Sequence, residues 1–177
     1  MTENLQNNTL FSQVVDLLQQ SKQQVIRAVN QTMVYTYYEI GRMIVEEEQN
    51  GKNRAEYGKQ LLKGLSQRLT DEFGKRFSVE NLDRMRKFYR VYSISSSLMR
   101  LFEITNSSSV MTNSESVNLE EKKTQSLISF FKLTWTHYIF LMRIDDEKER
   151  SFYEIETIKN NWSVRELKRQ YDTALYT

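Results

Sequence analysis

The chain has 177 residues, a formal net charge of +2 at pH 7, five glycines and neither proline nor cysteine. The lack of cysteine excludes disulfides and thiolate metal sites, and the small net charge confines any basic surface to local patches. The length suits one domain or two small ones, and the composition favours helix. The N-terminus is polar and no apolar run is long enough to span a bilayer, so we expect a cytoplasmic protein that does not enter the membrane.

An amphipathic pattern runs from about Phe11 to Glu48, with apolar residues at steps of three and four. Because the run is long for a globular helix and holds no strong stop signal, we expect two helices or one kinked helix. Its apolar face is broad enough to pair with a second copy, which predicts a homo-oligomer, most simply a dimer. The acidic run Glu46-Glu47-Glu48 is interpreted as a solvated helix end.

Two more helices are expected in the first half of the chain. The apolar stripe from Tyr57 to Phe73 predicts a helix over about 55–73, and Gly74 suits the left-handed residue that ends it. The next helix is expected from Ser78 to about Tyr92. Its core stripe is predicted to be Val79, Leu82, Met85, Tyr89 and Tyr92, with Phe88 on the flank.

One pattern of residue types occurs twice: an aromatic residue, Ser, Val, two polar residues, Leu, a polar residue and Arg. It is found in Phe77-Ser78-Val79-Glu80-Asn81-Leu82-Asp83-Arg84 and in Trp162-Ser163-Val164-Arg165-Glu166-Leu167-Lys168-Arg169. Serine is a strong N-cap because its hydroxyl accepts a hydrogen bond from an otherwise unpaired backbone N–H. The aromatic residue and the leucine occupy the two positions of a hydrophobic staple, and Glu166 would complete a capping box with Ser163. Each capped helix follows an earlier helix after a short turn, which predicts two helix-turn-helix units.

Composition changes after Tyr92, where nine serines fall between Ser93 and Ser116. This stretch is interpreted as a linker or long loop, in which the apolar residues 98–104 could form a short helix or part of a β-hairpin wing. Helix is expected again over about 119–131 and 136–143, then after a cap at Asp145 or Asp146, and from Ser163 to about Tyr176. The predicted organisation is a helical unit over 1–95, a Ser/Asn-rich linker over 96–118 and a second helical unit over 119–177.

Basic side chains project from the capped helices on the side away from the core stripes. They are Lys75 and Arg76 in the turn just before the first capped helix, Arg84, Lys87 and Arg90 on that helix, and Arg165, Lys168 and Arg169 on the second capped helix. Such residues could contact DNA phosphates or a groove. The competing interpretation is a solvated face, because Glu80–Arg84 and Asp83–Lys87 have the i,i+4 spacing of intrahelical ion pairs.

Short phrases throughout the chain carry a family resemblance. They are Tyr38-Glu39-Ile40-Gly41, Tyr57-Gly58, Leu65-Ser66, Phe73-Gly74, Phe77-Ser78, Asn81-Leu82, Met85-Arg86-Lys87-Phe88-Tyr89, Leu133-Thr134-Trp135-Thr136-His137-Tyr138, Arg150-Ser151-Phe152-Tyr153 and Trp162-Ser163-Val164-Arg165-Glu166-Leu167. In this order they resemble the N-terminal domain of the bacterial YhcG-like family, a domain of unknown function, over about residues 12–176. The resemblance implies a helical, winged-helix-like, DNA-binding domain that precedes a C-terminal nuclease domain of the PD-(D/E)XK class. The chain ends where that nuclease domain would begin.

A PD-(D/E)XK site needs acidic residues and a lysine on adjacent strands to hold a divalent metal and orient water. The nearest string, Asp145-Asp146-Glu147-Lys148, falls at a predicted helix start, where acidic residues complement the helix dipole. The lone histidine, His137, lacks partner ligands for zinc, which favours a structural role. We therefore predict no catalytic residue, no metal and no cofactor, and expect that this chain by itself is not an enzyme.

These observations predict an all-α fold, a helical bundle with helix-turn-helix, winged-helix-like units and at most one small β-hairpin. The predicted function is a DNA-binding and assembly module that positions DNA for a nuclease domain outside this chain. The alternative is a protein-interaction or oligomerisation module without direct DNA contact, since a helix-turn-helix can serve packing alone.

Overall fold

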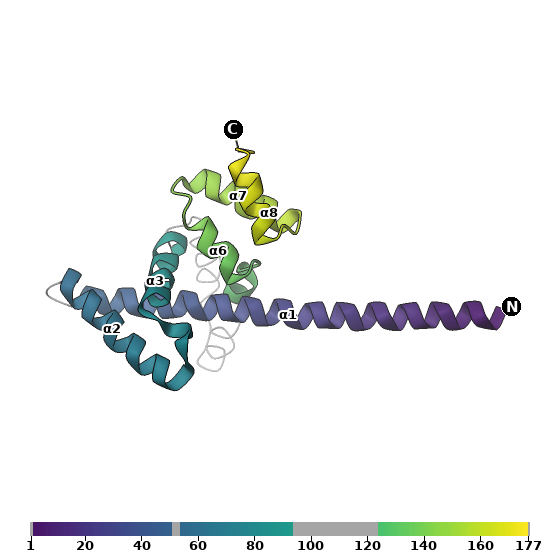
Figure 1. The fold of residues 1–177 in the computed structure, drawn as a ribbon, viewed down its shortest axis with the longest axis horizontal. Coiled ribbons are helices and arrows are strands. Elements are labelled where there is room, and N and C mark those ends of the chain that lie inside the picture. Colours follow the sequence, from purple (N-terminus) through teal and green to yellow (C-terminus); the bar gives the residue numbers. More distant parts are fainter. Residues whose placement is uncertain (1, 51–53, 94–123, 177) are drawn as a thin grey trace, which may run out of the picture.

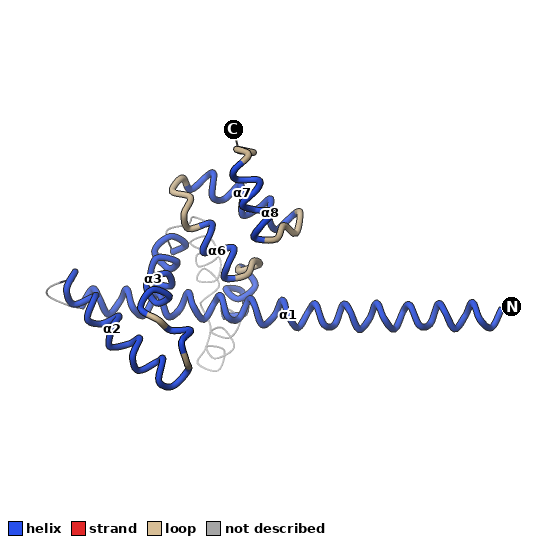
Figure 2. Tube along the Cα trace, in the orientation of Figure 1, coloured by secondary structure: helices blue, strands red, loops and turns tan. Residues whose placement is uncertain are grey.

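The computed structural model describes residues 2–50, 54–93 and 124–176. Regular structure in these residues is entirely helical, which confirms the all-α class (Figures 1 and 2). The elements are α1 (Thr2–Asn50), α2 (Arg54–Phe73), the 3₁₀ turn η1 (Lys75–Phe77), α3 (Val79–Ser93), a helix over 124–130, α6 (Trp135–Leu141), α7 (Glu147–Lys159) and α8 (Val164–Asp172). The hairpin predicted near 98–104 and the linker over 96–118 lie outside the described residues.

α1 is one continuous helix of 49 residues, roughly 70 Å long at 1.5 Å per residue. The expectation of a kink or of two helices is therefore wrong. The segment contains no proline, and its single glycine, Gly41, lies in the packed half, where other helices support it. The C-terminal half of α1 crosses α2 and α3, whereas its N-terminal half projects away from all the other described elements (Figure 1).

The backbones of α1 and α3 approach each other closely at Gly41. A Cβ atom on this residue would lie 2.1 Å from the carbonyl oxygen of Met85 and 3.0 Å from the Cβ of Tyr89. No side chain fits in that space, so glycine is required for this helix crossing. The contact between α1 and α3 is the most extensive one between described elements, and it fixes the orientation of α3.

An aromatic cluster surrounds Phe88 on α3. Its ring centroid lies 4.9 Å from that of Tyr92, 5.1 Å from Tyr138, 5.2 Å from Trp135 and 5.4 Å from Phe131. Tilted and edge-on pairs at these separations add to the stabilisation that burial alone provides. This cluster joins α3 to α6 and to the segment that leads into α6.

The buried face of α3 differs from the predicted stripe. Phe88, expected on the flank, has no exposed surface, whereas Val79 is 40% exposed and Tyr89 is only half-buried. The reason is that α3 packs against α1 on one side and α6 on another, so its buried face is wider than one stripe. Val79 lies in the first turn of α3, at the edge of these contacts.

A second apolar cluster lies between α1, α2 and α3. Its buried members are Tyr37, Ile44, Leu62, Leu82 and Met85. The half-buried Trp135 packs against this cluster and also against the aromatic cluster around Phe88. The core therefore continues from the first three helices into the later ones.

The predicted helix starts are confirmed by side-chain caps. In each case a backbone N–H three residues on donates to the capping oxygen: Asn81 to Ser78 Oγ (3.3 Å), Glu149 to Asp146 Oδ1 (2.8 Å) and Glu166 to Ser163 Oγ (3.2 Å). Phe77 and Trp162 pack against the clusters that contain Leu82 and Leu167, as the staple predicts.

Two details of the last helix differ from expectation. The Glu166 carboxylate does not turn back to complete a capping box, because it accepts hydrogen bonds from Arg169 (2.6 Å) and Gln170 (2.7 Å). α8 ends at Asp172, four residues before the predicted end at Tyr176. Ala174 then takes a positive φ of 55°, which turns the chain out of the helical path.

Candidate nucleic-acid interface

The turn between α2 and α3 presents two of the predicted cations. Gly74 follows the end of α2 with a φ of 84° and a ψ of 179°, an extended positive-φ conformation that favours glycine, and it is followed directly by Lys75 and Arg76. Both side chains are exposed. The side-chain amide of Asn81 donates to the carbonyl oxygen of Arg76 at 2.8 Å, so the backbone of this turn is fixed to the first turn of α3.

The three predicted cations on α3 have different surroundings. Arg84 forms an ion pair with Glu80 at 2.5 Å, as the i,i+4 spacing indicates. Arg90 lies 2.8 Å from the carboxylate of Glu48 on α1. Lys87 is exposed and forms no ion pair with any residue that the structure describes. The predicted alternative of an Asp83–Lys87 pair is not formed, because Asp83 pairs with Arg86 instead.

Glu48 connects three helices, which corrects its interpretation as part of a solvated helix end. It is buried, and its two carboxylate oxygens lie 2.5 Å from Arg86 and 2.8 Å from Arg90. A Cβ atom on Gly58 of α2 would lie 2.6 Å from the same carboxylate. Glu48 therefore fixes the end of α1 against α2 and α3, and it engages Arg90 within the protein.

The cations of α8 also divide into engaged and available side chains. Arg169 pairs with Glu166 at 2.6 Å, and hydrogen bonding to this guanidinium lowers the pKa of the Glu166 carboxyl group. Lys168 is exposed, with its Nζ 6.0 Å from the centroid of the Phe140 ring. Arg165 is exposed and forms no ion pair within the described part of the chain.

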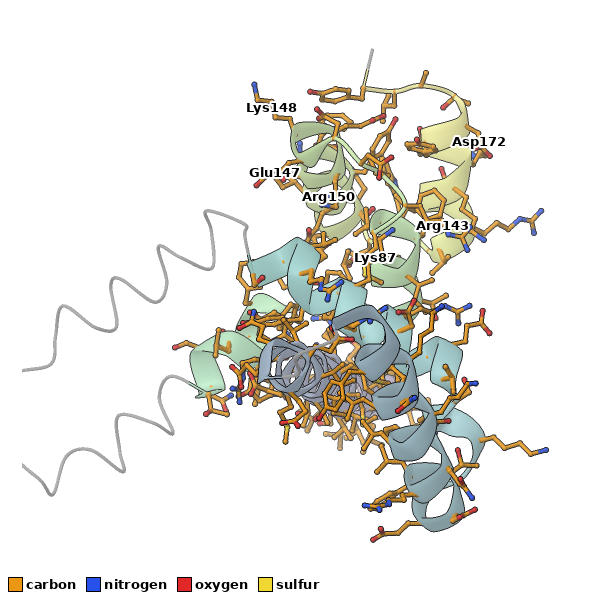
Figure 3. All side chains as sticks on the ribbon, turned by 90° about the vertical axis from the view of Figure 1, so that its left-hand side faces the viewer. Lys87, Arg143, Glu147, Lys148, Arg150 and Asp172 are labelled. Carbon is orange, nitrogen blue, oxygen red and sulfur yellow. The ribbon has the colours of Figure 1, made fainter. Side chains whose placement is uncertain are left out.

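The structure separates the two predicted basic sets. α6 contacts both α3 and α8 and lies between them in Figure 1. Figure 3 shows Lys87 on α3 and Arg143 just after α6 on the side of the molecule that faces the viewer. Arg143 is an exposed cation that sequence reasoning missed, since it follows a short helix and belongs to no helical stripe. It extends the exposed positive charge beyond α3.

His137 has the structural role that its surroundings in the sequence suggested. Its ring is buried; Nε2 donates to the Trp162 carbonyl at 3.0 Å, and Nδ1 accepts from the Thr134 hydroxyl at 2.7 Å. The carbonyl can only accept, which assigns the proton to Nε2. Burial lowers the pKa of His137, so the neutral ring is favoured. The ring connects the start of α6 to the turn between α7 and α8.

Glu154 is a half-buried acid that the sequence did not single out. Its carboxylate accepts hydrogen bonds from the hydroxyls of Tyr92 (3.1 Å) and Tyr138 (3.3 Å). Burial raises the pKa of Glu154 to about 7, against the opposing effect of these bonds and of Arg150. The group borders a cavity of about 390 Å³ that Lys132 and Arg150 also line. No sequence signal marks it, because its partners come from three separate segments.

Neither a metal centre nor a membrane span emerges from the described residues. They bring together no group of three or more histidine or acidic side chains that could hold a metal ion. None of the described helices has the length and apolarity required to cross a bilayer.

Comparison with known proteins identifies the family. The model of the DUF1016 N-terminal domain matches residues 13–177. The chain is 38% identical over 165 residues to an Escherichia coli (strain K12) protein named "Putative nuclease YhcG", and the match covers 92% of this chain but 44% of that relative. The chain thus spans less than half the length of this relative, and no solved structure matches it. The predicted resemblance is confirmed: the chain belongs to the family of the DUF1016 N-terminal domain.

Proposed function

We propose that this chain is a DNA-binding and assembly module that positions DNA for a nuclease domain outside the chain. The observation that carries the proposal is a set of exposed cations that form no ion pair with any described residue. They are Lys75, Arg76, Lys87, Arg165 and Lys168. A cation without an internal acidic partner can neutralise a phosphate and release its counterions.

The geometry of the first unit supports contact with the DNA backbone. Lys75 and Arg76 lie in a turn that Asn81 holds in place, and Lys87 lies on the helix that this turn introduces. Contacts from such cations to phosphates position a protein on DNA without reading its sequence. We expect binding that tolerates many sequences and weakens steeply with salt. Arg84 and Arg90 contribute less, because Glu80 and Glu48 already engage them.

The nuclease part of the proposal comes from the relative. The name of the Escherichia coli protein describes a nuclease, and more than half of that protein lies outside the match. The resemblance implies that a PD-(D/E)XK domain supplies the catalysis there. In this proposal the module brings DNA to such a domain and carries no catalytic residue of its own.

The test is a fluorescence-anisotropy titration of short duplex and branched DNA across a salt series. Arg76→Glu with Lys87→Glu is compared with Lys59→Glu with Lys63→Glu, two exposed lysines on α2 that give the same change in net charge. The first variant is expected to bind more than about tenfold more weakly, with a salt slope smaller by about 2, one for each phosphate that the variant no longer neutralises. The control should change affinity by less than about threefold, since the proposal places the phosphate contacts of this unit at the turn after α2 and on α3, and not on the first half of α2.

Two results would contradict the proposal. Equally weakened binding in the two variants would assign binding to net charge alone, and an absence of saturable binding at low salt would remove DNA from the function. The second candidate function, an interaction module without DNA contact, would then be favoured. A specific observation supports that candidate too: the N-terminal half of α1 exposes a long apolar face.

A further inference from the structure

The N-terminal half of α1 carries an apolar surface that no described residue covers. We call residues 9–32 of α1 the arm. Eight apolar side chains on it are each 45–67% exposed: Leu10, Phe11, Val14, Leu17, Leu18, Val25, Ile26 and Val29. At roughly 100 Å² of exposed surface for each side chain, they offer about 800 Å², the area that one partner contributes to a standard protein interface. Isolated exposed apolar residues are ordinary, but a continuous patch of this size indicates an interaction site.

Four of these side chains follow one line along the helix, and this line is not the face of α1 that carries the buried Val34 and Gly41. Phe11, Leu18 and Val25 are seven residues apart, and Val29 continues their line at a step of four. At about 100° per residue, this line lies roughly a third of a turn from the buried residues Val34 and Gly41. These four side chains therefore face away from the part of the core that Val34 and Gly41 contact.

The same line continues into a groove between α1 and α2. From Val29, a step of seven residues reaches Thr36, and the next reaches Met43, with Ile40 beside it. The groove has a volume of about 530 Å³, and its lining is apolar apart from Glu47. Its walls are Ile40, Met43 and Ile44 of α1, Leu61, Leu65, Leu69 and Phe73 of α2, and Phe77 of η1. Arm and groove thus lie along the same side of α1, with the exposed Thr36 between them.

We propose that this surface binds a second copy of the chain, with the two α1 helices antiparallel and each arm lying in the groove of its partner. Phe11 would lie against Met43 of the partner subunit, and Val25 against the partner's Val29, with the two-fold axis near residue 27. Such an interface is self-complementary, because each contact occurs twice. The arm is a single bare helix, so it can enter a groove bounded by two helices, in the manner of helix-in-groove recognition. This dimer does not depend on whether the chain binds DNA.

Charge and bulk favour the antiparallel arrangement over a parallel one. Glu47 lies on the same side of α1 as Met43, and parallel pairing would place it against Glu47 of the partner subunit, where like charges repel. Parallel pairing would also bring the two α2-bearing halves together and leave both arms outside the grooves. Antiparallel pairing opposes the two helix dipoles and fills each groove with an arm.

The first experiment measures the mass of the chain in solution by sedimentation equilibrium. We expect a dimer of twice the 21.2 kDa chain mass at micromolar concentration. Leu18→Glu with Val25→Glu should yield a monomer, with a dissociation constant at least about a hundredfold higher, since four charges would enter the apolar interface. Gln13→Glu with Gln20→Glu adds the same charge on the opposite side of the arm and should leave the dimer intact. Both substituted pairs are exposed in the single chain, so the core of each variant should remain folded.

The second experiment tests the direction of the pairing. The chain lacks cysteine, so Gln13→Cys gives one spin-label site on the outer side of each arm. Antiparallel pairing about residue 27 places the two labels 28 residues apart along the helices, or about 40 Å, whereas parallel pairing places them within about 20 Å. A short distance would overturn the antiparallel arrangement. A monomeric wild-type chain at micromolar concentration would overturn the proposed dimer.

Discussion

The carboxylate of Glu48, near the end of α1, lies 2.8 Å from the guanidinium of Arg90 on α3. Its other oxygen lies 2.5 Å from Arg86. One buried acid therefore neutralises two cations of the helix that the proposed function places near DNA. This contact divides the cations of α3 into anchored ones, Arg86 and Arg90, and an available one, Lys87.

Replacement of Glu48 tests this division. Glu48→Gln keeps the size of the side chain but removes the negative charge that both guanidinium groups share, while Arg86 keeps its ion pair with Asp83. We expect the free energy of unfolding to fall by about 2–3 kcal/mol, somewhat below the usual cost of breaking a fully buried pair, because Arg90 can reach water. Urea unfolding measures this change. In the control Glu46→Gln, which breaks an exposed pair with Arg42, the change should stay within about 0.5 kcal/mol. Equal effects would contradict an anchoring role for Glu48.

Glycine replacement distinguishes the crossing of α1 and α3 from an ordinary helix position. In Gly41→Ala the new methyl group meets the backbone carbonyl of Met85 at 2.1 Å, which flexible side chains cannot relieve. The helices must separate, and we expect a loss of about 2–3 kcal/mol. Gly64 lies within α2 with no atom near its missing side chain. Gly64→Ala should therefore stabilise the protein by about 0.5–1 kcal/mol through helix propensity. Thermal unfolding should shift in opposite directions for the two variants.

The buried ring of His137 predicts a loss of stability in acid. Because burial lowers the pKa of the folded-state ring, the unfolded chain binds a proton first as the pH falls below 6.5. Stability then decreases until the pH reaches the lower, folded-state pKa. His137→Gln lacks a titrating group while keeping a donor for the Trp162 carbonyl. Chemical unfolding at a series of pH values below 6.5 should show a smaller acid-induced loss in this variant than in the wild type. An equal acid-induced loss of stability in the variant and the wild type would contradict the titration of His137 as its cause.

Glu154 predicts a pH dependence of the opposite sign. Its pKa rises from 4.5 in the unfolded chain to about 7 in the folded protein. Between these values the unfolded chain loses its proton first, so stability decreases as the pH rises. The full effect is on the order of 3 kcal/mol for a shift of this size. Glu154→Gln keeps a carbonyl acceptor for Tyr92 or Tyr138 and should remove this decrease. Because His137 also changes stability in this pH range, the informative quantity is the difference between the stability-versus-pH curves of the variant and the wild type.

Local structure could be predicted from local patterns. The caps at Ser78 and Ser163 were found from residue types and spacing, and a third cap was narrowed to Asp145 or Asp146, because a cap depends on a few neighbouring residues. The start of α3 and the exposure of Lys75 and Arg76 followed from the same reasoning. The aromatic, serine and leucine positions of the repeated pattern were enough to locate the starts of α3 and α8.

Long-range contacts could not be predicted in this way. The amphipathic pattern of α1 gave no indication that its N-terminal apolar residues lie outside the core, since apolar spacing does not distinguish a core from an interface. Likewise, an acidic run at a helix end usually faces solvent, and only the packing of α2 and α3 on α1 encloses Glu48. The status of Arg90 as an anchored cation follows from that packing and from nothing in its own helix.

The sequence by itself therefore determined the all-α class, the starts of the capped helices and the family, because these depend on composition, short-range hydrogen bonding and ordered motifs. Tertiary structure alone decided that Glu48 engages Arg86 and Arg90, which apolar residues are buried and why the pKa of Glu154 rises. Those properties depend on side chains brought together from distant parts of the chain. Glu48 and Arg90 are 42 residues apart, and Tyr92 and Glu154 are 62 apart. Only the crossing of α1 with α3, at Gly41, and the packing of α3 near α7 bring such pairs within hydrogen-bonding distance.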